Sequence, residues 1–125
     1  MRELRPEGVP FKMAGKDYRL FFTLNVIDDI QTHFDCSIAE LPALINGIEK
    51  INNAKYILTR LINEGISIKA DDTGEKPVYL SEEYVGRHAL DHAGYSELIQ
   101  IILQSFIEST SPKHDEDDDP NAPSE

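Results

Sequence analysis

The chain is poor in cysteine and has no long apolar segment. Its 125 residues include one cysteine, Cys36, which cannot form an intramolecular disulfide, so a reducing intracellular compartment is favoured over secretion. No stretch approaches the roughly 20 apolar residues that a membrane span needs. Residues 1–10 carry charges and two prolines where a secretion signal would have an apolar segment. We therefore expect a cytoplasmic protein made without a leader.

Positive charge is also scarce. There are 12 Lys and Arg residues against 23 Asp and Glu, which gives a formal net charge of −11. Such a surface repels phosphates, and no basic stripe offsets it, so nucleic-acid binding is disfavoured. The basic residues near the start are spread out and balanced by acidic ones: Arg2, Arg5, Lys12, Lys16 and Arg19 against Glu3, Glu7 and Asp17.

Motifs that mark catalytic or cofactor sites are missing from the sequence. It has no glycine-rich phosphate loop, no G-x-S-x-G and no set of cysteines with metal-ligand spacing. Cys36 has no neighbouring motif that would mark it as a nucleophile. We expect no enzyme activity and no cofactor.

Two short patterns approach metal sites without completing one. His88 and His92 have the spacing that lets two imidazoles on one helix face reach a zinc ion, but the glutamate of a zincin motif is absent. Asp71-Asp72-Thr73-Gly74 resembles the start of a calcium loop. Position six of that loop, which must be glycine, is Lys76. We interpret the first pattern as a partly exposed helix face and the second as a solvated turn, with no metal in either.

Residues 11–22 alternate between apolar and polar side chains, which predicts a β-hairpin. Its turn is placed at Ala14-Gly15, because glycine accepts the positive φ that a tight turn needs. The side chains expected on the apolar side are Phe11, Met13, Tyr18, Leu20 and Phe22.

Helical spacing of apolar residues begins after the hairpin. A first helix is expected with Asn25 as its cap and acidic residues in its first turn. A second follows Ser37, whose S-x-x-E pattern has the capping-box form, although Pro42 favours a later start. A third is expected over residues 53–64 and ends at Gly65.

The second half of the chain is predicted to open with a break over residues 66–77, where the flanking apolar residues could pair as a short hairpin. Ser81 is expected to cap a fourth helix, which ends at Gly94. Ser96 is expected to cap a fifth.

The fifth helix carries apolar residues around most of its circumference, whereas an ordinary surface helix buries one face. It is therefore either the central helix of the fold or a helix shared with a partner, which could be a second copy of the chain. The side chains proposed to bind a partner are Leu98, Ile101, Ile102 and Phe106.

Together these patterns predict an α+β fold that is mostly α, with an N-terminal β-hairpin followed by about five short helices in one domain, residues 1–111. Residues 112–125 are predicted to be a disordered acidic C-terminal tail, because their polar, proline-containing sequence cannot bury enough apolar surface. Six acidic residues and one lysine give residues 113–125 a net charge of −5.

Several strings resemble tail assembly chaperones of tailed bacteriophages and prophages. They are FKMAGKDYRLFFTLNVIDDIQTHF, AKYILTRLINEGI, DDTGEKPVYLSEEYVGRHA and the acidic C-terminus, and together they span nearly the whole chain. The resemblance implies a protein of the host bacterial cytoplasm that is absent from the finished virion. It would bind the long tape-measure protein, keep its apolar helices soluble and help recruit tail-tube subunits.

Two other classes stay open on the sequence. An acidic DNA mimic or regulatory protein-binding module would also be small and negative, but a mimic should concentrate carboxylates on its folded body. Nearly half of the net charge here lies in residues 113–125. A small hydrolase or metal enzyme is the third choice, since an active site assembled from distant residues leaves no sequence motif.

Overall fold

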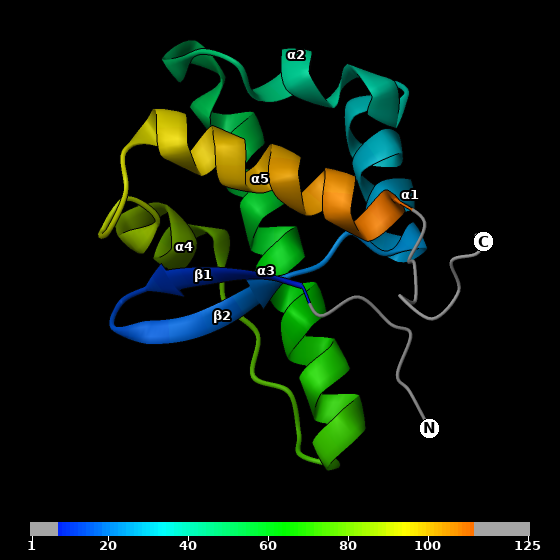
Figure 1. Cartoon of the computed structure of the whole chain (residues 1–125), viewed down its shortest axis with the longest axis vertical. Coiled ribbons are helices and arrows are strands. Elements are labelled where there is room, and N and C mark those ends of the chain that lie inside the picture. Colours follow the sequence, from blue (N-terminus) through cyan, green and yellow to red (C-terminus); the bar gives the residue numbers. More distant parts are fainter. Residues whose placement is uncertain (1–7, 112–125) are drawn as a thin grey trace, which may run out of the picture.

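The described part of the chain begins with an antiparallel β-hairpin and continues as a series of helices (Figure 1), as the sequence predicts. A computed structural model describes residues 8–111. The predicted disorder of residues 112–125 lies outside this range. Within it, the α+β, mostly α, fold class is confirmed.

The hairpin consists of β1 (Val9–Met13) and β2 (Lys16–Leu20). Ala14 and Gly15 form its two-residue turn with φ of 52° and 73°, the pair of positive values that matches the twist of the flanking strands. Alternate residues of β1 are buried, as the period of two predicts. The hairpin and its turn are therefore confirmed.

Helix α1 (Leu24–Phe34) begins two residues earlier than expected. The Thr23 hydroxyl accepts a hydrogen bond from the Val26 amide at 3.2 Å, so Thr23 is the cap and the prediction of Asn25 is wrong. Asp28 and Asp29 consequently lie beyond the first turn. The helix ends at Asp35, which has a left-handed backbone with φ of 54°.

The second predicted helix is divided into short pieces. Ser37 caps only a 3-10 turn, η1 (Ile38–Glu40), where its hydroxyl accepts from the Ala39 amide at 3.1 Å. Helix α2 (Leu41–Ile45) follows, with Pro42 in its first turn. It therefore starts later than Ser37, as Pro42 predicted. A further 3-10 turn, η2 (Ile48–Lys50), leads into the next helix.

Helix α3 (Ile51–Thr73) is much longer than predicted, because it continues through Gly65. Strand β2 packs against the helix at this point, and a Cβ on residue 65 would collide with the carbonyl oxygen of Arg19. Gly65 therefore permits a close approach and does not stop the helix. The stop is Gly74, with φ of 78°. The predicted break and second hairpin are wrong over residues 66–73, which are helical.

The last two helices are α4 (Glu82–His88) and α5 (Tyr95–Thr110). Ser81 caps α4 as predicted, accepting from the Tyr84 amide at 3.1 Å. Gly94 does not end α4 but precedes the first turn of α5, where its N–H donates to Glu97 at 2.9 Å. The prediction that Ser96 caps α5 is therefore wrong by two residues.

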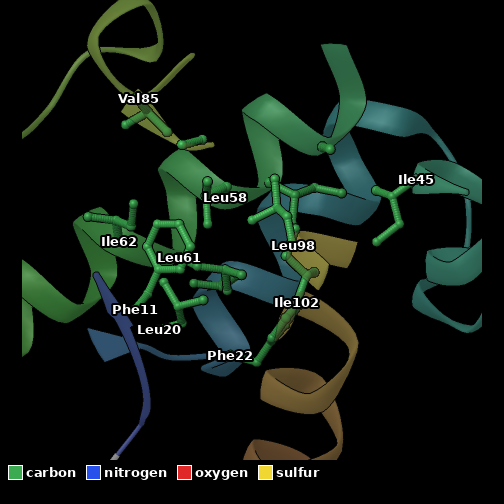
Figure 2. Close-up of a cluster of buried hydrophobic side chains, with 14 of the residues drawn as sticks. Phe11, Leu20, Phe22, Ile45, Leu58, Leu61, Ile62, Val85, Leu98 and Ile102 are labelled. Carbon is green, nitrogen blue, oxygen red and sulfur yellow. The ribbon is translucent and has the colours of Figure 1, made fainter. Parts of the chain in front are cut away.

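One hydrophobic core joins all these elements. Helix α3 lies at its centre, in contact with β2, α1, α2 and α4, while α5 contacts β1 and α2. Figure 2 shows that the hairpin, α3, α4 and α5 contribute side chains to the same cluster. Fully buried members include Met13, Leu20, Val26, Ile30, Leu41, Ile45, Ile57, Leu58, Leu61, Ile62, Val85 and Ile102.

An ion-pair network fastens α1 to α3. Arg60 Nε donates to Asp29 Oδ2 at 2.6 Å and Nη1 donates to Glu64 Oε1 at 2.8 Å. The other Glu64 oxygen accepts from the Thr23 hydroxyl at 2.6 Å. Burial alone would lower the pKa of Arg60, but its hydrogen bonds to the two carboxylates raise that pKa above its usual value.

The Arg60→Lys variant is expected to lose about 1–2 kcal/mol of unfolding free energy, since a lysine keeps the charge but cannot hold both carboxylates with a planar fork. Arg87→Lys is the matched control, because Arg87 pairs with Glu83 on an exposed surface and such pairs contribute under about 1 kcal/mol. Urea unfolding measures both. Equal losses in the two variants would contradict a structural role for the Arg60 network.

Candidate protein-binding site

The structure divides the four predicted partner-binding residues between core and surface. Leu98 and Ile102 are only 4% and 0% exposed, so these two side chains belong to the core. Ile101 and Phe106 are half-buried, and the Phe106 ring meets Phe22 edge-on with centroids 5.2 Å apart. A role for Ile101 and Phe106 in partner binding stays a prediction.

Helix α5 is also held by hydrogen bonds to the end of β2 and to the segment that follows it. The buried Ser105 hydroxyl donates to the Leu20 carbonyl at 3.3 Å, and the Ser109 hydroxyl accepts from the Phe22 amide at 3.1 Å. The core therefore uses one face of α5, centred on Leu98, Ile102 and Ser105. Ile107 remains 60% exposed.

A concave apolar surface lies where the first half of α3 meets α4 and the start of α5. Its volume is about 370 Å³, within the range of 300–1,000 Å³ typical of ligand pockets. We call it the groove. It is lined by Ile51, Asn52, Ala54, Lys55, Leu58, Glu83, Gly86, Ala89, Leu90, Tyr95 and Leu98.

Two large apolar side chains of the groove face solvent. Ile51 is 43% exposed and Leu90 is 46% exposed, although the groove residues Leu58 and Leu98 are buried. Leu98 is thus the one predicted partner-binding residue that lines this surface. Ile51 and Leu90 were not predicted as site residues, because the sequence placed Leu90 inside a helix ending at Gly94 and Ile51 ahead of the third helix. The structure ends α4 at His88, which leaves Leu90 just beyond it.

The turn between α4 and α5 positions Leu90. His88 Nδ1 lies 3.0 Å from Asp91 Oδ2, and the same carboxylate oxygen accepts from the Ala14 amide at 3.3 Å. These contacts tie the turn to the tip of the hairpin. Leu90 therefore sits on an anchored segment and not on a free loop.

Tyr95, another residue that lines the groove, is attached to α2. Its hydroxyl donates to the Ile45 carbonyl at 2.9 Å. A tyrosine hydroxyl is protonated at neutral pH and can donate. Burial and the nearby Glu49 carboxylate raise the pKa of Tyr95 further. The groove wall formed by Tyr95 is thus held in place at neutral pH.

The two metal-like patterns take other conformations. Helix α4 ends at His88, so His88 and His92 do not share a helix face, and His88 contacts Asp91. Asp71 and Asp72 belong to the last turn of α3 and not to a solvated turn between strands. Within residues 8–111, no group of three or more His, Cys, Asp or Glu side chains could hold a metal ion.

Comparison with known proteins adds no relative. No protein-family model, curated protein or solved structure matches the chain. None of the helices described in residues 8–111 is long and apolar enough to cross a membrane. The features that bear on function are therefore the groove, its exposed side chains Ile51 and Leu90, and the acidic charge.

Proposed function

We propose that this protein is a tail assembly chaperone of a tailed bacteriophage or prophage, acting in the host bacterial cytoplasm. It holds an apolar helix of the tape-measure protein and helps recruit tail-tube subunits. The observation that carries the proposal is the groove, whose Ile51 and Leu90 expose apolar surface beside buried core residues. The sequence resemblance described above names the client.

A helix is the occupant that suits this surface. Amphipathic helices bind by laying apolar side chains at i, i+3, i+4 and i+7 into a groove between other helices. The groove is bounded by helices α3, α4 and α5 and accommodates a few such side chains. A client helix lying there would cover Ile51 and Leu90.

The acidic surface suits a holding function. A protein that covers an apolar client must keep the complex in solution, and a net charge of −11 opposes association of one complex with another. No catalytic step is required of it. Binding alone, from exposed apolar area on a rigid surface, would protect the client.

The Leu90→Asp variant is expected to bind the tape-measure protein at least 10-fold more weakly. Burying a large aliphatic side chain contributes about 1.5–3 kcal/mol, and the introduced carboxylate would lose hydration in the complex. Co-expression of the two proteins tests this. The client should stay in the soluble fraction with the wild type and aggregate with the variant.

Leu24→Asp is the control variant. Leu24 is 84% exposed and lies in the first turn of α1, where an acidic residue is tolerated, so this change adds the same charge away from the groove. It should keep the client soluble. The client could stay soluble with all three proteins, the wild type, Leu90→Asp and Leu24→Asp, or aggregate with all three. Either result would mean that the groove is not the client site. Circular dichroism would establish that both variants are folded.

A further inference from the structure

A second, larger cleft lies between β2, the C-terminal half of α3 and the segment that follows α3. Its volume is about 830 Å³. Figure 1 shows this half of α3 extending beyond the hairpin, with residues 74–80 returning beside it. The apolar part of the wall includes Phe21, Ile62, Ile66 and Leu80. The cleft shares no lining residue with the groove.

Positive charge concentrates in this cleft. Lys16, Arg19, Lys69 and Lys76 line it, which is four of the nine Lys and Arg residues in the described part of the chain. Only three of the fifteen described Asp and Glu residues line it. The cleft is therefore slightly positive on a protein that is strongly negative elsewhere.

Three of these cations have no ion-pair partner among residues 8–111. Lys16, Lys69 and Lys76 make no salt bridge with any residue of the described range, although acidic residues outnumber basic ones there. Asp17, at the edge of the cleft, is paired with Lys12 at 3.8 Å. The three ammonium groups are thus available to an anionic occupant.

We propose that the acidic C-terminal residues 113–125 of the same chain bind in this cleft. Six carboxylates against one lysine give them the complementary charge. The described chain ends just beyond α5, where Ser109 contacts Phe22, and the adjacent Phe21 lines the cleft. Five of the six carboxylates lie in residues 115–119. From Ser111 to residue 119 the chain can span at most about 26–29 Å.

Such binding is governed by effective concentration and by salt. The lysines are exposed, so each contact is weak, but the covalent link keeps the carboxylates at an effective concentration near the millimolar range. Screening should release the contact at high ionic strength. The cleft would then be occupied, and an acidic partner would have to displace residues 113–125 to bind there.

Zero-length cross-linking with a carbodiimide tests this on the full chain. Carboxylates of residues 115–119 are expected to link to Lys16, Lys69 and Lys76 at least fivefold more often than to Lys12, which is exposed but does not line the cleft. The preference should fall several-fold in 0.5 M salt. Equal yields at all four lysines, or none, would overturn the proposal.

A mixture of isotope-labelled and unlabelled protein identifies the source of each link. Links within one chain support the proposal, whereas links mainly between labelled and unlabelled chains would show that a second copy is the occupant and overturn it. The Leu90→Asp variant should give the same pattern, because the groove is a separate surface. Client binding and C-terminal binding can therefore fail independently.

Discussion

The Ile102→Ala variant is expected to lose about 3 kcal/mol of unfolding free energy, within the range of 2–5 kcal/mol usual for large-to-small changes in a core. Ile102 is fully buried within the cluster shared by the hairpin, α3 and α5. A domain of this size is stabilised by only about 5–15 kcal/mol, so the loss would be large. Urea unfolding followed by circular dichroism measures it.

Ile107→Ala is the matched control on the same helix. Ile107 is 60% exposed, and its truncation should change the stability of a monomer by no more than about 0.5 kcal/mol. Ile107→Ala could instead lose as much unfolding free energy as Ile102→Ala, with a urea midpoint of unfolding that rises with protein concentration. This result would show that α5 is an interface between copies. A concentration-independent midpoint would contradict the predicted self-association.

Alanine is expected to destabilise the protein at Gly65 but not at Gly86. Gly65→Ala should destabilise by about 1–3 kcal/mol, because its methyl group would collide with the Arg19 backbone and force β2 away from α3. Gly86→Ala should be neutral or stabilise by up to about 1 kcal/mol, because alanine favours a helix. There the new methyl group meets only the flexible end of the Lys55 side chain.

Thermal unfolding of the two glycine variants measures the difference. Each change adds one methyl group within a helix, so helix propensity alone predicts stabilisation at both positions. If Gly65→Ala proves as stable as Gly86→Ala, the close packing of β2 on α3 is wrong. The comparison thus tests the contact between the hairpin and the central helix.

Local chemistry made the hairpin predictable. The alternation around Ala14-Gly15 and the positive φ at its turn depend on neighbouring residues only, and both were confirmed. The cap at Ser81 was predictable for the same reason. The cap of α1 was not predictable in this way: Asn25 was predicted, but the cap is Thr23, because the position of the cap depends on how the chain enters the helix.

Gly65 shows why the length of α3 was missed. A glycine after an apolar helical stretch has the usual form of a stop, but here its missing side chain makes room for a strand some 45 residues earlier in the chain. That requirement is tertiary and leaves no local pattern. The error at Gly65 also produced the erroneous break over residues 66–73.

The groove could not be predicted either, because its walls come from separate parts of the chain. Ile51, Leu90 and Leu98 are placed together only by the packing of α3, α4 and α5. Leu98 was predicted to bind a partner because it lies on a helix that is apolar around most of its circumference. That pattern does not distinguish a buried face from an exposed one, and Leu98 is buried. Only the fold distinguishes Leu98 from the exposed Leu90.

Site-specific photo-cross-linking to the tape-measure protein is the most direct test that the groove holds a client helix. A photoreactive amino acid in place of Leu90 should cross-link to the client in the soluble complex, and mass spectrometry should map the links to one face of an apolar helix. The same group in place of Leu24 should give little product, because that residue lies outside the groove. Efficient cross-linking from position 24 with none from position 90 would contradict the proposed site.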